Sequence, residues 1–357
     1  MGARSEVNYL FITHTLTQVV NKLQLKRQNE SGEIKVWSGK DPNQKQIIQQ
    51  WCIENNFKIG DEWLNAGIQW LSNGSTSDNP MDLWWYSYVK NPTNRHNFSR
   101  HSRMEFGKYA DEGSGYILEG RSSLDQVMSN IYESAKRIIP SSADDTDQER
   151  IDHYISIIEK YIVQIVDTLM PLKQEYGEVM TQYPIVLTMK GLTVPFIGFA
   201  DFVFIKDNKI ARVVELKTMW PNPKGYYKKN YKDKLQGDRI WTKQSLPVEA
   251  KPINLPQLAI YSAGLNHLLD LLYVNETDCV LMQYEDHPEI QWDNLTEVLK
   301  YVRVNAITRQ NYLSLVDDPT ELYQLIQPDF SHWKWRGVEK EFLNDAKNIW
   351  LNQKGKV

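Results

Sequence analysis

The sequence has few cysteines and no long apolar run, and each absence excludes a class of protein. Only Cys52 and Cys279 are present in 357 residues, which excludes a four-cysteine iron–sulfur cluster or zinc knuckle and argues against a disulfide framework. No apolar run approaches the roughly 20 residues of a membrane span, and no signal peptide is recognisable. We therefore expect an intracellular, cytoplasmic protein that does not interact with membranes.

The chain also lacks a G-x-x-x-x-G-K-[ST] phosphate-binding loop, so we expect no ATP-driven motor of that type. Its formal net charge is −4, and no global positive field therefore indicates nucleic acid. This charge does not exclude a metal-dependent nuclease, because such an enzyme needs carboxylates and can confine its basic surface to one segment. We expect a helical accessory region over residues 1–100 and a larger domain over residues 101–357.

Two apolar runs separated by a polar turn make up residues 198–217, which read G-F-A-D-F-V-F-I-K-D-N-K-I-A-R-V-V-E-L-K. This pattern predicts a β-hairpin. The runs contain three charged residues, Asp201, Glu215 and Lys217, and buried charges are costly unless they are paired or bind a metal. Glu215 and Lys217 share one face of the second strand, because side chains alternate along a strand.

Asp201 joins this face only if the hairpin register sets it against the odd-numbered residues of the second strand. A two-residue turn at Asp207 and Asn208 alone would place Asp201 opposite Val214. We therefore expect either a loop with an odd number of residues, such as 207–209, or a β-bulge.

Two carboxylates on neighbouring strands can hold a divalent metal of the magnesium type, which prefers oxygen ligands. The backbone carbonyl of Leu216 is a further candidate ligand. A bound metal activates water and offsets charge on a phosphodiester, and Lys217 can hold the attacking water or stabilise the transition state. The E-x-K pattern alone is most often an exposed ion pair, and Asp201 favours the metal site because it adds a second carboxylate.

Gln257 and Tyr261 lie four residues apart in N-L-P-Q-L-A-I-Y, and so on one face of a predicted helix. Such a pair alone indicates little more than a helix surface. It follows G-x-x-D and E-x-K in order, however, and this ordered set resembles that of the RecB-type nucleases of the PD-(D/E)XK superfamily. The chain is most similar to the mitochondrial genome maintenance exonucleases and related phage exonucleases, over about residues 104–285.

The resemblance implies an α/β fold with a PD-(D/E)XK, restriction-endonuclease-like core, in which helices flank a mixed central β-sheet. It implies metal ligands at Asp201 and Glu215, a catalytic lysine at Lys217, and organising roles for Gln257 and Tyr261. The first family motif, a glycine followed four residues later by histidine, matches best at Gly107, with Asp111 at the histidine position as a further metal ligand. The competing residues for this position are Glu105, Glu112, Glu119 and His101.

A polar insertion follows the hairpin over residues 219–252, with eight positive and three negative charges. A charge run is usually a solvated face, yet its position directly after Lys217 favours a loop that contacts nucleic acid. A shorter basic segment over 91–103 is either a solvated linker or a second phosphate contact. The phosphate-binding candidates of the insertion are Lys224, Lys228, Lys229, Lys232, Lys234, Arg239 and Lys243. The aromatic residues among them that could stack on bases are Trp220, Tyr226, Tyr227, Tyr231 and Trp241.

The apolar periodicity predicts further elements around the hairpin. We expect a helix over 104–137, weakened by Gly113, Ser114 and Gly115, and a long helix over 148–172. A third helix is predicted over 253–273, followed by a strand over 278–284.

These patterns together predict Mg²⁺- or Mn²⁺-dependent hydrolysis of DNA phosphodiesters, on single-stranded DNA or on double-stranded DNA with ends. The preference for ends comes from the resemblance and not from the residues. The alternatives are a structure-specific or sequence-specific endonuclease of the same superfamily, and a non-cleaving nucleic-acid-binding protein. The resemblance makes phage replication or recombination, in the cytoplasm of a host cell and with the proteins of those processes as partners, a plausible setting.

Overall fold

The computed structural model describes residues 11–12, 50–76, 79–93, 101–226 and 239–351. Its centre is a six-stranded mixed sheet in the order β1-β2-β3-β4-β7-β8. Strands β4 and β7 are parallel, and the other neighbours are antiparallel. The prediction of a mixed central sheet flanked by helices is confirmed. The strands are β1 (Phe11–Ile12), β2 (Glu178–Met189), β3 (Phe196–Lys206), β4 (Lys209–Thr218), β7 (Asp270–Val274) and β8 (Cys279–Met282).

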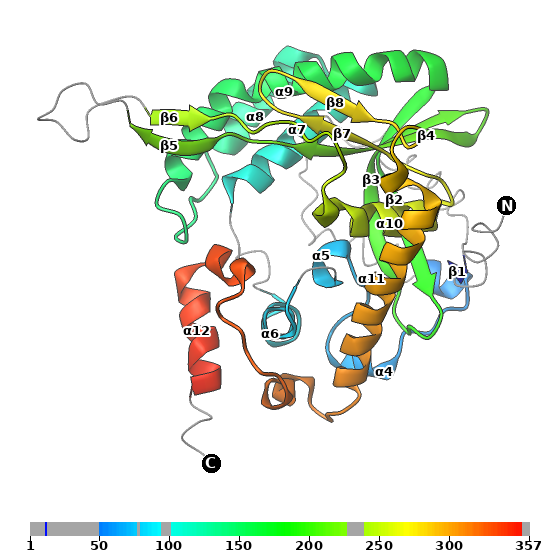
Figure 1. Cartoon of the computed structure of the whole chain (residues 1–357), viewed down its shortest axis with the longest axis vertical. Helices are drawn as coiled ribbons and strands as arrows, with labels where there is room; N and C mark the ends of the chain where they lie inside the picture. The colour runs from blue at the N-terminus through cyan, green and yellow to red at the C-terminus, as the bar shows by residue number, and fades with distance from the viewer. Residues whose placement is uncertain (1–10, 13–49, 77–78, 94–100, 227–238, 352–357) are drawn as a thin grey trace, which may run out of the picture.

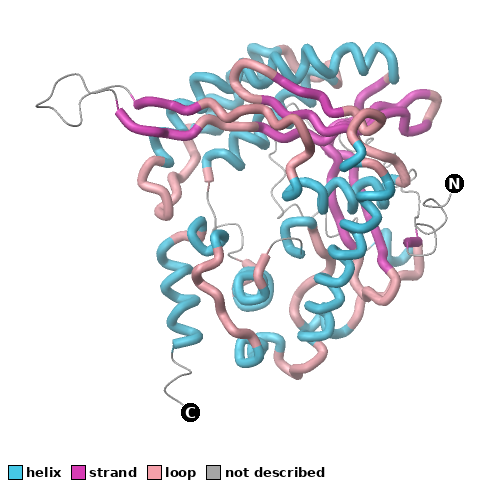
Figure 2. Tube along the Cα trace, in the orientation of Figure 1, coloured by secondary structure: helices cyan, strands magenta, loops and turns pink. Residues whose placement is uncertain are grey.

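Helices cover both faces of this sheet (Figures 1 and 2). One core contains Phe202 and Phe204 of β3 together with α7, α8 and α9, and the other contains Val203 together with α10 and α11. This division follows from the alternation of side chains along a strand. The helices are α7 (Ser102–Leu118), α8 (Leu124–Ala135), α9 (Asp147–Tyr176), α10 (Leu255–Leu265) and α11 (Trp292–Leu313).

The described part of the N-terminal hundred residues is mainly helical and packs against the C-terminal segment (Figure 1). Trp63 donates its indole N–H to Gln310 of α11 at 3.1 Å, and Tyr86 donates its hydroxyl to Asp345 of α12 at 2.8 Å. The two ends of the described chain therefore share one core. The elements are α4 (Asp61–Asn65), α5 (Asn73–Thr76), α6 (Met81–Trp84), a π-helical turn (Trp85–Lys90) and α12 (Lys340–Leu351).

The hairpin of β3 and β4 meets the register condition by means of a bulge. Its turn has two residues, Asp207 and Asn208, both with positive φ, the backbone of a type I′ turn. The register then shifts between Phe204 and Ile205, so that Phe202 pairs with Val214. Continued by one residue, this register sets Asp201 against Glu215.

Helix α7 is continuous through Gly113, Ser114 and Gly115, so these residues do not interrupt it. The helix expected over 104–137 is instead divided between Leu118 and Leu124, into α7 and α8. The glycines of α7 permit close packing. A Cβ on Gly115 would lie 2.8 Å from Thr181 Cγ2 of β2, and one on Gly107 would lie 3.2 Å from Thr218 Oγ1 of β4. Gly107, Asp111 and Gly115 lie at intervals of four residues, on one face of the helix. The glycines therefore let α7 approach the sheet on both sides of Asp111.

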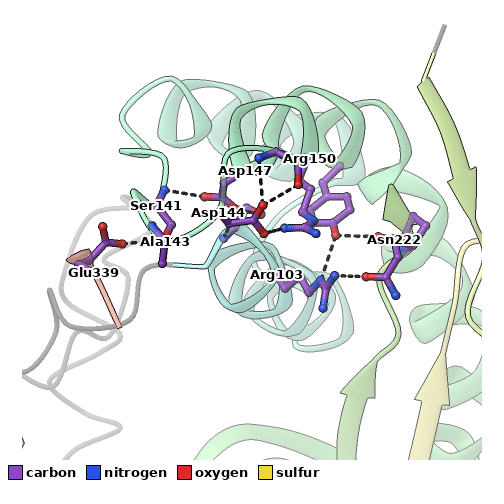
Figure 3. Close-up of polar contacts among 12 residues, drawn as sticks. Arg103, Ser141, Ala143, Asp144, Asp147, Arg150, Asn222 and Glu339 are labelled. Atoms are coloured by element: carbon purple, nitrogen blue, oxygen red, sulfur yellow. Dashed lines mark hydrogen bonds and ion pairs between the residues drawn. The ribbon is translucent and has the colours of Figure 1, made fainter. Parts of the chain in front are cut away.

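Polar side chains fix the start of α7 to the neighbouring segments (Figure 3). Ser102 donates its hydroxyl to Asp147 at 2.7 Å, and Asp147 also accepts the Ser141 N–H at 2.9 Å. Ser141 in turn donates to Glu339 near the start of α12, at 2.7 Å. One continuous network thus joins α7, α9 and the C-terminal segment.

Two other sequence predictions need correction. The helix expected over 253–273 ends at Leu265, and Asp270–Val274 forms the buried strand β7, because a short apolar run fits a helix and a buried strand equally well. The basic insertion contains a two-stranded arm, β5 (Asn222–Tyr226) with β6 (Arg239–Thr242), which extends to the left in Figure 1. In the part of the chain that the structure describes, no helix is long and apolar enough to cross a bilayer.

The packing of α7 predicts that Gly115→Ala destabilises the protein. The new Cβ would crowd Thr181, and overpacking costs about 1–3 kcal/mol of the free energy of unfolding. At Gly74 of α5 an added Cβ meets nothing within 4 Å, so Gly74→Ala should be neutral or slightly stabilising because alanine favours a helix. Urea unfolding curves measure both variants, and equal stabilities would contradict the close packing of α7 on β2.

Candidate active site

The side chains of Asp201, Glu215 and Lys217 converge where β3 and β4 lie side by side. Lys217 Nζ donates to Glu215 Oε1 at 2.7 Å, and the backbone N–H of Leu216 donates to Asp201 Oδ2 at 2.8 Å. The carboxyl groups of Asp201 and Glu215 also interact directly. Glu215 is only 1% exposed. The structure therefore brings together the three charges that the sequence pattern singled out.

Helix α10 supplies the two remaining residues of the ordered motif set. Gln257 donates its amide N–H to Glu215 Oε1 at 2.6 Å and accepts from Lys217 Nζ at 3.0 Å. Tyr261, one turn later and buried, accepts the Phe199 N–H at 3.3 Å. The Tyr261 ring lies where a side chain at position 198 would be, since a Cβ on Gly198 would come within 2.2 Å of it. The glycine of G-x-x-D is therefore required for the tyrosine of Q-x-x-x-Y to dock.

Asp111 reaches this cluster from α7, through a residue that the sequence analysis missed. Gln182 of β2 donates its amide N–H to Asp111 Oδ2 at 2.5 Å and to Asp201 Oδ1 at 3.3 Å. No spacing rule indicates Gln182 in the sequence, because it belongs to none of the recognised motifs. Its position becomes apparent only when β2 is paired with β3.

The competitors of Asp111 make other contacts. Glu105 pairs with Lys108 on the helix surface at 2.9 Å, and Glu119 accepts from the N–H and the hydroxyl of Thr181. His101 precedes the first residue of α7 as its N-cap. Glu112 contributes to the negative potential at Asp111. Asp111 is joined to Asp201 by a hydrogen-bonded bridge through Gln182, whereas the contacts described for Glu105 and Glu119 lead elsewhere.

Burial and mutual repulsion set the electrostatics of the site. Burial raises the pKa of Asp111 well above its ordinary value, and the Asp201, Glu112 and Glu215 carboxylates raise it further. Burial, and to a smaller extent the Asp201 charge, raises the pKa of Glu215 to about 8. Burial lowers the pKa of Lys217, but the Glu215 and Asp201 charges outweigh it, so that the net pKa is raised. The site therefore pairs one firmly charged lysine with carboxylates that resist ionisation.

Two carboxylate oxygens of the site lack a hydrogen-bond donor. Asp111 Oδ1 and Glu215 Oε2 are both buried, and no N–H or hydroxyl donor of the described residues reaches them; beyond its Oε1 contacts, Glu215 meets the Asp201 carboxyl group. By contrast, three buried carboxylates elsewhere in the fold, Asp82, Asp147 and Asp270, have a donor on each oxygen. Buried polar atoms are normally satisfied, and exceptions call for an explanation such as an ion.

The donor set of the site fits a hard divalent cation in its chemistry. Carboxylate oxygens are the ligands that Mg²⁺ and Mn²⁺ prefer, and the two unsatisfied oxygens belong to residues on either side of Asp201. Within the described ranges, no group of three or more His, Cys, Asp or Glu side chains is already arranged as a metal site. Leu216 contacts Asp201 through its N–H, and the assignment of its carbonyl as a ligand stays a prediction.

The predicted phosphate-binding residues fall into three groups. Lys224 of β5 is exposed, and Lys243 is exposed but paired with Asp278 at 2.8 Å. Arg239 pairs in β6 through its backbone with Tyr226. The other four, Lys228, Lys229, Lys232 and Lys234, lie outside the described residues, as do the aromatic candidates Tyr227 and Tyr231.

Two residues of the basic segments have structural contacts instead of exposed surfaces. Trp220 is 2% exposed and stacks on Tyr161 with ring centroids 4.1 Å apart, so its proposed stacking on bases is wrong. Arg103, from the segment over 91–103, hydrogen-bonds Asn222 of β5 and the Tyr154 hydroxyl (Figure 3). These contacts anchor the base of the β5–β6 arm to α7 and α9.

The crowding of carboxylates predicts that Asp111→Asn stabilises the metal-free protein. The asparagine removes the carboxylate charge that Asp201, Glu112 and Glu215 repel, and it keeps an oxygen for the Gln182 amide. The control is Asp167→Asn on the exposed surface of α9, which removes the same charge and should leave stability nearly unchanged. Thermal unfolding at neutral pH in excess chelator compares the variants, and a melting temperature of Asp111→Asn below that of the wild type would contradict the repulsion.

No protein-family model matches this chain, and neither a curated protein nor a solved structure matches it. The interpretation of the site therefore rests on the order of the motifs along the chain and on the geometry of the side chains. Both point to one cluster, formed by Asp111, Asp201, Glu215, Lys217 and Gln257.

Proposed function

We propose that the protein is a metal-dependent deoxyribonuclease with a PD-(D/E)XK core that hydrolyses DNA phosphodiesters from ends. The observation that carries this proposal is the cluster of Asp111, Asp201 and Glu215 beside Lys217, with unsatisfied buried oxygens on two of the carboxylates. A fold that needed these charges only for stability would gain from replacing them, because buried carboxylates without donors are destabilising. Their presence is accounted for by a cation and an anionic substrate.

The roles within the site follow from its contacts. Asp111, Asp201 and Glu215 would hold Mg²⁺ or Mn²⁺, which when bound supplies an activated water and offsets charge on the phosphate. Lys217 lies beside Glu215, where its ammonium group can orient the attacking water or stabilise the negative transition state. Gln257 fixes both of these side chains with one amide group.

Tyr261 has a supporting role in this scheme. Burial raises its pKa, and so do the charges of Glu215 and Asp201, so the phenol stays protonated. Its docking over Gly198 and its contact with the Phe199 N–H hold α10 against β3. Gln257 is then presented to the carboxylates from a rigid element, as a preorganised site requires.

The β5–β6 arm is the proposed DNA-contacting element. It starts at Asn222, shortly after the end of β4, the strand that carries Lys217. Its base is fixed by Trp220, Tyr154 and Arg103. Lysine and arginine residues on such an arm would bind backbone phosphates without reading sequence. Hydrolysis of a phosphodiester is the whole of the proposed reaction, and the P-loop motif of ATP-driven motors is not in the sequence.

Exonuclease activity is favoured over endonuclease activity by the family resemblance. A non-cleaving DNA-binding protein is the second candidate of a different class. The intact charged set argues against it, because a protein without catalytic activity has no need for a half-buried lysine beside a cluster of three carboxylates.

The proposed activity predicts that the purified chain degrades end-labelled linear DNA with Mg²⁺ or Mn²⁺ and leaves a closed circle intact. Lys217→Met is expected to reduce the cleavage rate by about 10²–10³-fold, as is usual for loss of one transition-state-stabilising group. Lys209→Met, in the exposed first position of β4, is the matched control and should cleave normally.

Each other outcome has a defined meaning. Cleavage of the circle would favour the endonuclease, and binding without cleavage across several metals would favour the non-cleaving protein. Full activity of Lys217→Met would contradict the assignment of the catalytic lysine.

The proposed role of the arm predicts that Lys224→Gln weakens DNA binding to a similar extent for different sequences. The loss of one phosphate contact should reduce the slope of log K against log salt by about 1. Binding of fluorescent DNA in Ca²⁺ at several salt concentrations measures this slope, with Lys209→Gln as the control. An unchanged slope for Lys224→Gln would exclude Lys224 from the DNA-binding surface.

A further inference from the structure

Gln182 has an unusual backbone conformation for its position in the sheet. Five described residues other than glycine have positive φ, and four of them are asparagine or aspartate: Asn56, Asp207, Asn208 and Asn266. These two residue types tolerate the left-handed region, whereas other side chains adopt it at a cost. Gln182, with φ of 51°, is the fifth. It lies inside β2 and not in a turn or at a helix end.

The pairing of β2 with β3 shows where the strained residue lies in the sheet. Thr181 pairs with Phe202 and Tyr183 with Ala200, so the register is unbroken and Gln182 lies opposite Asp201. A residue strained within an otherwise regular ladder persists only where surrounding contacts hold it, and such residues cluster at functional sites.

The contacts that hold Gln182 are the two carboxylates. Its amide nitrogen faces Asp111 Oδ2 at 2.5 Å and Asp201 Oδ1 at 3.3 Å, so a neutral group separates two acidic ones. A carboxylate can only accept, and an amide N–H₂ provides two donors. One side chain therefore binds both residues at once.

The same contacts leave particular oxygens free. Asp111 uses Oδ2 for Gln182 and keeps Oδ1 unsatisfied, while Glu215 uses Oε1 for Lys217 and Gln257 and keeps Oε2 unsatisfied. Two amide side chains, Gln182 and Gln257, thus brace the carboxylates from opposite elements, β2 and α10. Gln257 belongs to a recognised motif, and Gln182 does not.

We propose that Gln182 is a positioning residue of the cation site, which orients Asp111 and Asp201 so that Asp111 Oδ1 and Glu215 Oε2 face a divalent metal beside the Asp201 carboxylate. This inference rests on the proposed metal-dependent function and adds a residue to its site. Residues that hydrogen-bond metal ligands in this way are worth about 10–100-fold in metal affinity.

The test is the affinity of the full-length, DNA-free protein for Mn²⁺. It is measured by isothermal titration calorimetry, or by the loss of the electron paramagnetic resonance signal of free Mn²⁺. Gln182→Met keeps the length of the side chain and removes the amide, and should raise the Kd about 10–100-fold. Gln182→Asn tolerates the left-handed backbone but is one methylene too short to reach both carboxylates, and should weaken binding in the same range. The second variant guards against a failure of the first to fold.

Thr181→Val is the matched structural control. It breaks the hydrogen bond from the Thr181 hydroxyl to Glu119 at 2.7 Å, the neighbouring link between β2 and α7, without touching the site. Wild-type affinity in this variant and weakened affinity in both Gln182 variants is the expected result. If Thr181→Val weakens Mn²⁺ binding as much as the Gln182 variants do, Gln182 acts only by linking the helix to the sheet, and the proposal is overturned.

Two further results would overturn it in distinguishable ways. If the Gln182 variants bind Mn²⁺ as tightly as the wild type, or more tightly, Gln182 does not position the ligands, while the metal site itself stands. If the wild type binds no Mn²⁺, or Asp201→Asn binds it equally well, the proposed metal-dependent function fails together with this inference.

Discussion

Repulsion among buried carboxylates is the constraint on which the arrangement of the site depends. Asp111, Asp201 and Glu215 come from three different elements, and besides burial the Asp201 charge raises the pKa values of both Asp111 and Glu215. Like charges in a medium of low polarity repel more than they do in water. The hydrogen-bond donors that hold these carboxylates together are one lysine, two side-chain amides and one backbone N–H. Each of these donors is itself fixed by regular structure, which makes the site rigid.

Three local features of the chain bring those elements to the same place. The bulge in the β3–β4 hairpin sets Asp201 against Glu215 despite a two-residue turn. Gly198 makes room for Tyr261 and so for the docking of α10. Gly115 lets α7 approach β2 closely enough for Asp111 to reach Gln182. None of these features contributes a functional group, yet removal of any one would displace a carboxylate or its donor.

Much of this site could be predicted from the sequence, because its residues occur at spacings with a direct geometric meaning. Alternation along a strand places Glu215 and Lys217 on one face, and a helical turn separates Gln257 from Tyr261. Asp201 can face Glu215 only with an odd-numbered loop or a β-bulge in the hairpin, and the structure has the bulge. The helix face shared by Gly107 and Asp111 follows in the same way.

The rest could not be predicted, because it depends on contacts between segments distant in sequence. The left-handed backbone of Gln182 has no local signal, since glutamine is not a residue type that favours it. The sequence of Asp270–Val274 fits a helix as well as a strand, since all five residues are buried in the structure and a fully buried segment has no informative periodicity. Trp220 looked like an exposed aromatic of a basic loop, and only the packing of α9 shows that Tyr154 and Tyr161 enclose it.

The core shared by the two ends of the chain has a consequence for biosynthesis. Trp63, Trp85 and Tyr86 are buried through contacts with residues 310, 319 and 345, which lie 247, 234 and 259 residues later in the chain. Domains generally fold as units as synthesis proceeds from the N-terminus, but here the first described helices have no complete partner until more than 200 further residues have been synthesised. Tryptophan side chains therefore stay exposed on the nascent chain over that interval, and the protein is expected to depend on chaperones that bind apolar segments at the ribosome.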